Sequence, residues 1–279
     1  IIFVLDRPII MQETIDQIHV PIIWLDHHES IKRMGVHYYN PTENDKNDNR
    51  CTSYWAYKVA GTPETEWIAA VGIFADWMMP DFLTTFKYKD LVEGKTSPPE
   101  VMFDSTYGKI IRAFSYVLKG ETKAMKGNIE ALKKIQTPYE ILNQETPAGK
   151  LLYANYEKFN KEYSSLLTKA LDQAKKEPGE LFLFTYPSTK TSFTGELSNE
   201  LLYRLTSYNY FIVGREKDGT LRMSIRSRTH PIRDALKKAV GEVGGFGGGH
   251  PLACGGSIRT EEQTRFIATL KQELNKHTQ

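Results

Sequence analysis

The sequence predicts an α/β fold with two domains joined by a long helix, and three observations support this prediction. Two short apolar runs, residues 1–5 and 22–25, are separated by a helical segment, a pattern typical of parallel strands with a right-handed crossover. A long amphipathic stretch covers residues 147–176. Further along, two strand-like segments flank Asp218-Gly219, a strong hairpin signal. The chain has 279 residues, which suits about two domains.

The first domain is predicted over residues 1–146 and contains a parallel sheet. Its two strands end at Asp6 and Asp26. Apolar and polar spacing predicts the remaining segments: helices over 11–18, 52–60, 64–75, 107–118 and 128–135, and loops over 40–49 and 87–99. Thr52 or Ser53 is expected to cap the helix that begins there. Residues 147–178 form the predicted connecting segment, which Pro178 and Gly179 end.

The second domain is predicted over residues 179–279, as a smaller mixed α/β unit with a cleft between it and the first domain. Its expected strands cover 181–186, 210–214 and 221–227, and another strand ends at Ile258. Helices are expected over 198–206 and from Pro231 onward. The glycine-rich stretch 243–249 is predicted to be a loop, and Thr260 is expected to open the last helix with a capping box.

Composition limits the classes of function. A hydrophobic content of 40% and a charged content of 25% are globular values. The 36 Lys and Arg against 34 Asp and Glu give a net charge of +2, which argues against a broad surface that coats nucleic acid but allows a local basic groove. Cys51 and Cys254 lack metal-binding spacing, which favours a reducing, cytoplasmic location. No apolar run reaches the roughly 18 residues of a membrane span, so no membrane partner is expected.

Acidic and imidazole side chains follow the predicted strands directly. Asp26, His27 and His28 come after one strand and Asp6 after the other, and function collects at the carboxyl ends of parallel strands. Asp76 lies near the end of a predicted helix among apolar residues, where a carboxylate needs a partner. Carboxylates and imidazoles without thiolates favour Mn²⁺ first, and Mg²⁺ or Co²⁺ next. These residues therefore predict a divalent metal site.

The glycine-rich stretch that ends in His250 is the second unusual feature. It lets a backbone approach a phosphate closely, with an imidazole at its edge, although a flexible structural loop explains it equally well. Its spacing fits neither the dinucleotide fingerprint nor the P-loop. Nearby, Arg222, Arg226 and Arg228 alternate along one predicted strand and share a face, which suggests phosphate contacts or simply a charged outer surface.

Together these motifs resemble the DHH phosphoesterase superfamily, in the subgroup with the DHH-associated C-terminal domain that includes RecJ-like exonucleases and nanoRNase-like enzymes. The segment Asp26-His27-His28 resembles the motif that names the family, and Gly247-Gly248-Gly249-His250 resembles the C-terminal motif. The resemblance covers nearly the whole chain. It implies Asp6, His27 and Asp76 as metal ligands, with Asp26 and His28 as catalytic residues, of which Asp26 orients a neighbour.

The resemblance also implies a substrate-binding set, which consists of Arg226, Gly247, Gly248, Gly249 and His250. One departure is that the family's first motif, a His-x-Asp-x-Asp-like cluster, is absent, because the chain opens inside the strand that carries Asp6. Either an N-terminal segment is missing or the protein begins here, and the first alternative is favoured. The metal set is then incomplete, because two ions are expected in the complete protein. These residues alone are expected to be catalytically silent.

The function implied is a manganese-dependent phosphodiesterase or exonuclease that hydrolyses single-stranded DNA or RNA, or short oligonucleotides, to nucleotides. One alternative is hydrolysis of a cyclic dinucleotide or of 3′-phosphoadenosine phosphate. An alternative of another class is a non-catalytic replication or scaffold protein with the same fold. The choice between DNA and RNA, the substrate length and polarity, and the oligomeric state are not predicted.

Overall fold

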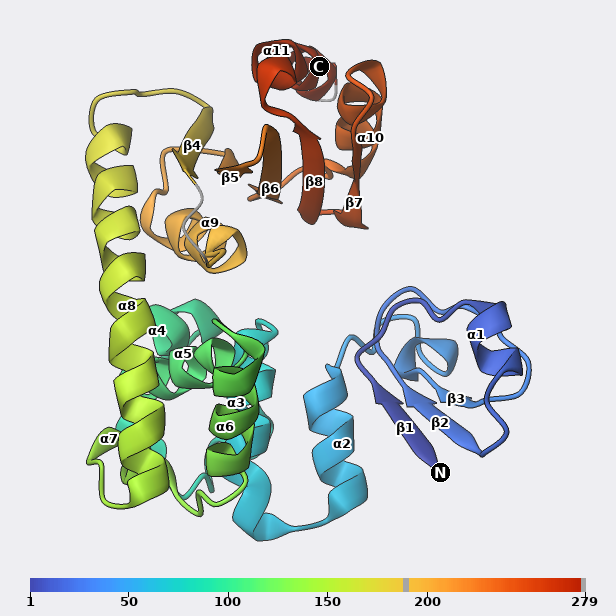
Figure 1. Cartoon of the computed structure of the whole chain (residues 1–279), viewed down its shortest axis with the longest axis vertical. Helices are drawn as coiled ribbons and strands as arrows, with labels where there is room; N and C mark the ends of the chain where they lie inside the picture. Colours follow the sequence, from blue (N-terminus) through green and yellow to red (C-terminus); the bar gives the residue numbers. More distant parts are fainter. Residues whose placement is uncertain (188–190, 277–279) are drawn as a thin grey trace. The chain divides into compact units, whose positions relative to one another are not determined.

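The computed structural model of the chain, shown in Figure 1, describes residues 1–187 and 191–276. The chain divides into two compact units. The first comprises residues 1–118 and 126–155, and the second comprises residues 119–125 and 156–279.

The first unit contains a three-stranded sheet whose strands are all parallel. Its order is β1 (Ile2–Leu5), β2 (Ile22–Leu25) and β3 (His37–Tyr39), with α1 (Gln12–Asp16) between the first two strands. The predicted parallel pair is therefore confirmed. The third strand was not predicted, because three residues with a polar histidine give no periodic signal. Since all three strands run the same way, the residues after them lie at one edge of the sheet.

Helices form most of the rest of the first unit. Together with the 3₁₀ turns between them, they are η1 (Pro41–Glu43), α2 (Thr52–Ala60), η2 (Pro63–Thr65), α3 (Glu66–Ala75), η3 (Lys89–Val92), α4 (Pro98–Asp104), α5 (Tyr107–Val117), α6 (Thr122–Leu132) and α7 (Pro138–Leu142). Of these helices, α6 has its first residues, 122–125, in the second unit. The helices α2 and α3 approach closely at Gly72, where a Cβ atom would lie 2.1 Å from the Ser53 hydroxyl oxygen. This contact joins the helix that follows the sheet to the helix that carries Asp76.

The predicted loop over residues 87–99 is wrong in part, because η3 lies inside it and α4 begins at Pro98. Both α4 and α7 were missed, although each starts with a proline and a capping box. In α4, Ser97 and Glu100 form the box, and in α7 the pair is Thr137 and Glu140. That pattern of Ser/Thr-Pro with Glu three residues after the cap is a usable sequence signal for such short helices.

The long helix α8 (Pro147–Ala174) confirms the predicted amphipathic helix, and part of it belongs to each unit. The predicted division at residues 146 and 178 stays a prediction. No helix in residues 1–187 and 191–276 is both long and apolar enough to cross a lipid bilayer.

The second unit is built on a five-stranded mixed sheet in the order β4-β5-β6-β8-β7. Its strands are β4 (Leu181–Pro187), β5 (Tyr210–Lys217), β6 (Thr220–Ser227), β7 (Phe246–His250) and β8 (Ala253–Arg259). The pair β4 and β5 is parallel, and all other pairs are antiparallel. The predicted hairpin is confirmed, since β5 and β6 join at Asp218 and Gly219, which both have positive φ.

Helices cover both faces of this sheet. On one face α10 (Arg233–Glu242) and α11 (Gln263–Asn275) bury the side chains of Leu221, Met223 and Ile225. On the other face α9 (Thr194–Arg204) lies against β5 and β6. The unit is therefore a three-layered arrangement.

Two local predictions in this unit are wrong. The glycine stretch is not a loop, because residues 246–250 form the edge strand β7, paired with β8. Glycine is unfavourable in a strand but not excluded, and here the backbone pairing alone defines the element. The predicted capping box at Thr260 is also absent: Thr260 starts the 3₁₀ turn η4 (Thr260–Glu262), and its hydroxyl has no partner among the described residues.

Candidate functional site

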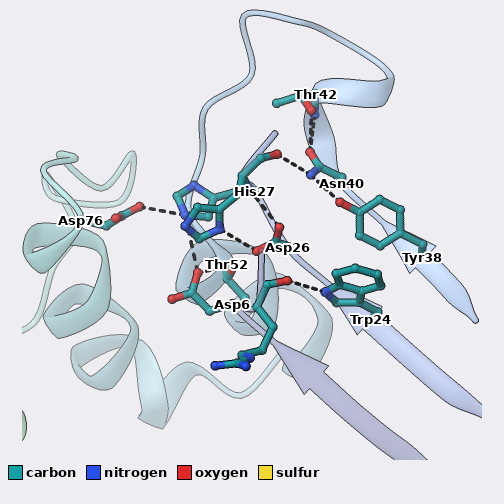
Figure 2. Close-up of polar contacts among 11 residues, drawn as sticks. Asp6, Trp24, Asp26, His27, Tyr38, Asn40, Thr42, Thr52 and Asp76 are labelled. Carbon is teal, nitrogen blue, oxygen red and sulfur yellow. Dashed lines mark hydrogen bonds and ion pairs between the residues drawn. The ribbon is translucent and has the colours of Figure 1, made fainter. Parts of the chain in front are cut away.

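The three residues predicted as metal ligands lie together in the first unit, as Figure 2 shows. The Nε2 atom of His27 is 3.5 Å from an oxygen of Asp6 and 3.6 Å from an oxygen of Asp76. His27 is largely buried, with 12% of its side chain exposed, whereas Asp6 and Asp76 are 61% and 44% exposed. The imidazole therefore lies at the bottom of the site and the carboxylates at its open side.

Asp6 is held by the end of the sheet. Its backbone has a φ of +58°, a left-handed conformation that aspartate tolerates better than most residues. The indole N–H of the fully buried Trp24 donates to the carbonyl of Arg7, 2.9 Å away, and so fixes the turn after Asp6. The hydroxyl of Thr52 donates to the Asp6 carboxylate at 3.1 Å. Thr52 was predicted as a cap, but it is the first residue of α2 and binds Asp6 instead.

Asp76 is placed by the way α3 ends. The amide of Trp77 donates to Phe74 and that of Met78 donates to Ile73, which is the hydrogen-bond pattern of a Schellman motif. Glycine usually occupies the left-handed position of this motif, but here Trp77 does, with a φ of +62°. A bulky residue in this conformation is strained, and such strain often accompanies functional sites. The turn directs Asp76 toward His27.

The charges around this cluster suit a cation. Partial burial raises the pKa of Asp76 above its ordinary value; the charge of His27 opposes the shift, and that of Asp6 adds to it. Within residues 1–187 and 191–276, no lysine or arginine forms an ion pair with Asp6 or Asp76. The only basic side chain paired with Asp6 and Asp76 among these residues is therefore the imidazole of His27.

The dimensions of the cluster also fit a divalent ion. Ligand atoms of Asp6, His27 and His28 lie within 4.8 Å of one another. Two ligands each about 2.1 Å from one ion are roughly 3–3.5 Å apart, close to the separations of His27 from both carboxylates. Asp76 lies outside this compact set, and among the described residues its carboxylate contacts only Nε2 of His27, so Asp6, His27 and Asp76 could hold one ion together only if the Asp76 side chain moves closer to Asp6.

Asp26 is fully buried and orients the ring of His28. One of its carboxylate oxygens is 2.8 Å from Nδ1 of His28, and the other accepts the backbone N–H of His28 at 3.2 Å. A proton on Nδ1 is thereby favoured, which leaves the Nε2 lone pair directed elsewhere. The rings of His27 and His28 have centroids 4.6 Å apart, so the oriented imidazole adjoins the cluster.

Asn40 was missed by the sequence analysis, which placed it in a polar loop. It is almost completely buried, and its side-chain amide donates to the carbonyl of His28 at 2.8 Å and to the Tyr38 hydroxyl at 2.9 Å. Its carbonyl oxygen accepts from the backbone and hydroxyl of Thr42 (Figure 2). Asn40 thus fixes the backbone of the segment that carries both histidines. The Asn-Pro pair just after an aromatic segment was the available signal.

The residues predicted to bind substrate lie in the second unit, on the face of its sheet that α9 covers in part. Pairing places Arg226, Ala253 and His250 in one row across β6, β8 and β7. Since paired residues on neighbouring strands project to the same side, Arg226 and His250 share a face with only a methyl group between them. His250 is exposed.

Arg226 is oriented by neighbouring groups. Its Nε donates to the side-chain oxygen of Asn199 on α9 at 2.7 Å, and its Nη1 donates to the carbonyl of Ile225 at 3.0 Å. Burial lowers the pKa of Arg226 below its ordinary value, although a guanidinium stays charged at neutral pH. Arg228 has a different role, because its guanidinium binds the carbonyls of Leu202 and Leu205 at the end of α9.

The predicted glycines divide into two groups. Gly247 and Gly249 face packed atoms, since a Cβ at Gly249 would lie 2.6 Å from the carbonyl oxygen of Ala253. Gly248 faces open space, with no atom within 4 Å of the position that a methyl group would take, and its neighbour Gly255 has only one such contact, at 3.6 Å. The structure itself therefore does not require glycine at position 248.

Comparisons with known proteins identify the second unit. Residues 183–276 match the model of the DHHA1 domain. The matched residues include the glycine strand β7, which is the C-terminal of the two motifs; the other, Asp26-His27-His28, lies outside the match. The chain therefore carries a DHHA1 domain, and this domain supports the DHH phosphoesterase superfamily. The resemblance inferred from the C-terminal motif is confirmed over these residues.

Solved structures share the DHH fold over nearly all of this chain. RecJ from Thermus thermophilus in complex with Mn²⁺ is 19% identical with a TM-score of 0.64, and the match covers 98% of this chain and 44% of that one. The DHH domain of a protein described as a member of a ribosomal-protein family is 16% identical with a TM-score of 0.63, covering 94% and 65%. A pGpG-specific phosphodiesterase from Vibrio cholerae is 12% identical with a TM-score of 0.51, covering 95% and 89%.

The chain thus spans less than two thirds of the length of the first two structures. No curated protein matches it in sequence. The likenesses confirm the mixed α/β fold, with its parallel three-stranded and mixed five-stranded sheets.

Proposed function

We propose that this DHH protein is a metal-dependent phosphodiesterase that hydrolyses single-stranded or short nucleic acids to nucleotides. The observation that carries the proposal is the convergence of Asp6 and Asp76 on Nε2 of His27, at 3.5 and 3.6 Å. The similarity to RecJ and to a pGpG-specific phosphodiesterase supports phosphoester hydrolysis and the use of a divalent metal.

Asp6, His27 and Asp76 would hold the metal, for which Mn²⁺ is our first choice. Their oxygen and imidazole donors suit Mn²⁺, and Mg²⁺ or Co²⁺ come next. A bound divalent ion supplies a hydroxide nucleophile at neutral pH and stabilises phosphoryl oxygens. The protein's part is to fix the ligands, which it does through Thr52, the turn after Asp6 and the Schellman end of α3.

His28 is proposed to act next to the substrate phosphate. Its ring is oriented by the buried Asp26, so its Nε2 atom can donate to or accept from a phosphate oxygen or a leaving group. In the second unit, Arg226 is proposed to bind phosphate, and His250 and the glycines Gly247, Gly248 and Gly249 to bind the nucleotide. That the substrate lies between the two domains stays a prediction.

Removing the charge of Asp26 should impair catalysis more than metal binding. In Asp26→Asn the side chain keeps its size, but the negative charge that favours the Nδ1 proton of His28 is lost. Because residues 1–279 alone are expected to be silent, turnover is measured in a longer form that carries the first motif, and there we expect it to fall about 100-fold, in the range that partners of functional histidines show. Steady-state kinetics and Mn²⁺ binding are measured together, with Asp16→Asn, an exposed carboxylate on α1, as the control. Unchanged turnover in Asp26→Asn would contradict this role for His28.

The two kinds of glycine in β7 give a second expected result. An alanine at Gly248 should fold normally, because its methyl meets open space, yet it should weaken oligonucleotide binding if a substrate approaches that backbone. Gly249→Ala should instead lower the thermal stability, because its φ is +140° and its methyl would collide with Ala253. Melting temperatures and dissociation constants of both variants check this. Equal oligonucleotide affinity in Gly248→Ala and wild type would argue against a substrate at this strand.

The decisive experiment is a Mn²⁺ titration with labelled single-stranded DNA and RNA of several lengths, run on this chain and on a longer form that carries the first motif. Release of mononucleotides by the longer form that His27→Ala abolishes would support an exonuclease. Retained oligonucleotide binding by the longer form without cleavage of any substrate would favour the non-catalytic scaffold, and robust cleavage by residues 1–279 alone would contradict the ligand assignment. The similarity to the pGpG-specific enzyme favours one further candidate, a dinucleotide phosphodiesterase, so pGpG, a cyclic dinucleotide and 3′-phosphoadenosine phosphate are assayed in parallel.

A cytoplasmic location is part of the proposal. Its support is that both cysteines, Cys51 and Cys254, are free thiols, as expected in a reducing compartment.

A further inference from the structure

The face of the second sheet that carries Arg226 and His250 continues beyond them in two more rows. The next row across β6, β8 and β7 consists of Ser224, Gly255 and Gly248. The row after that consists of Arg222, Ser257 and Phe246. Since side chains alternate along a strand, all three rows project to the same side of the sheet. In the middle row only Ser224 has a side chain, so the backbone of the two glycines is uncovered by side chains of that row.

The third row combines positive charge with an exposed aromatic ring. Phe246 is 72% exposed, although phenylalanine is normally buried, and Arg222 is also exposed. Ser257 lies buried between them. The row therefore presents a cation and a ring on either side of a small residue.

A second arginine adds to this charge. Arg215 on β5 is paired with Arg222 on β6, and like charges directly opposite each other destabilise a sheet. In the part of the chain that the structure describes, neither guanidinium has a carboxylate partner. The Nε atom of Arg215 is buried without a hydrogen-bond acceptor among those residues. An anion bound at the exposed Arg222 would reduce the repulsion between the two guanidinium groups.

The helix α9 does not extend over the third row of this face. The helix begins at Thr194, whose hydroxyl is 3.0 Å from that of Ser224, and Asn199 lies beside Arg226. From its first residue, beside Ser224, the helix runs along β6 toward Arg226. Arg222 lies on the other side of Ser224, away from the helix. In the third row Arg222 and Phe246 are exposed and can meet a ligand.

We propose that Arg222 and Phe246, supported by Arg215, form a second subsite for a single-stranded oligonucleotide, in which the arginines bind a backbone phosphate and Phe246 stacks on a base. This inference rests on the proposed function and extends it to the length of the substrate. Arg222 and Arg226 are four residues apart, or about 13 Å along a strand. A stacked single strand advances about 3.4 Å per nucleotide, so the two arginines are roughly four nucleotides apart.

The chemistry selects an oligonucleotide over smaller phosphates. Base stacking on an aromatic ring together with a phosphate-binding arginine is the usual way to hold a single strand without sequence preference. A dinucleotide at the Arg226 end is too short to reach Phe246, whereas a hexanucleotide covers both ends. The subsite therefore distinguishes short oligonucleotides from cyclic dinucleotides and 3′-phosphoadenosine phosphate.

The test measures the affinity of the full chain for single-stranded DNA and RNA of two, four and six nucleotides, by titration calorimetry at several salt concentrations. Arg222→Ala should weaken hexanucleotide binding about tenfold or more and leave dinucleotide binding unchanged. It should also reduce the slope of log affinity against log salt by about 0.7, the value for one phosphate contact on a single strand. Phe246→Ala should show the same dependence on length without the change in salt slope.

Two further variants make the outcomes distinct. Arg226→Ala should weaken binding at every length, and Arg265→Ala, which removes an exposed charge from α11 on the opposite side of the sheet, should change nothing. Loss of affinity by Arg226→Ala but not by Arg222→Ala or Phe246→Ala would overturn the second subsite and leave the proposed function in place. If the wild-type chain binds no oligonucleotide of any length, the proposed function and the subsite both fail.

Discussion

Replacing His27 with alanine should lower the affinity for Mn²⁺ by more than about 100-fold and abolish any hydrolysis that Mn²⁺ supports. Both carboxylates converge on His27, so its loss removes one proposed metal ligand. It also removes the imidazole that lies near both Asp6 and Asp76. Even partners that merely orient metal ligands contribute about 10- to 100-fold. Mn²⁺ binding is measured by electron paramagnetic resonance of the free ion, independently of catalysis.

The matched control for this change is His19→Ala, an exposed histidine outside the cluster. It should bind Mn²⁺ as the wild type does. If His27→Ala also retains wild-type affinity while its melting temperature is unchanged, the ion is bound elsewhere and the assignment of Asp6, His27 and Asp76 is wrong.

The substitution Gly72→Val should destabilise the first unit by about 3 kcal/mol and weaken metal binding at the same time. Any Cβ at this position would lie 2.1 Å from the hydroxyl oxygen and 2.6 Å from the Cβ of Ser53, so rotating the serine cannot relieve the clash. Overpacking of this kind costs about 1–3 kcal/mol, occasionally more. The helices α2 and α3 must move apart, and they carry Thr52, which binds Asp6, and Asp76 itself.

Urea denaturation measures the stability, and Mn²⁺ titration measures the site. Gly127→Ala on α6 is the control, because nothing lies within 4 Å of the added methyl group. Removing a helical glycine there should raise the free energy of unfolding by about 0.5–1 kcal/mol. A Gly72→Val variant as stable as the wild type would show that the two helices do not need their close approach.

The convergence of Asp6, His27 and Asp76 could be anticipated from sequence because each of these residues ends or follows a recognisable element. Asp6 and His27 follow apolar strands, and parallel strands bring their carboxyl ends to one edge. Asp76 follows a helix whose apolar residues give a clear period. The ends of such strands and helices can be predicted from nearby residues. The position of the residue that follows each end can therefore be predicted too.

The supporting residues could not be anticipated, because their roles depend on contacts between distant segments. Thr52 lies 46 residues from the carboxylate that it binds, and Trp24 lies 17 residues from the carbonyl that it holds. Asn40 looks like any loop asparagine until its burial is known. Likewise the glycine stretch lacks every side-chain signal of a strand, and only the partner strand β8 reveals it as one.

The position of β7 at the edge of its sheet has a consequence for hydrogen exchange. Three of its five residues are glycines, so few side chains anchor it, and only β8 supplies it with backbone partners within the sheet. Segments with so few buried contacts open with a small free energy. In the free protein the amides of Gly247 to His250 should exchange with solvent deuterium sooner than those of the central strand β6. An oligonucleotide that rests on this strand should slow that exchange, which gives a label-free record of where the ligand lies.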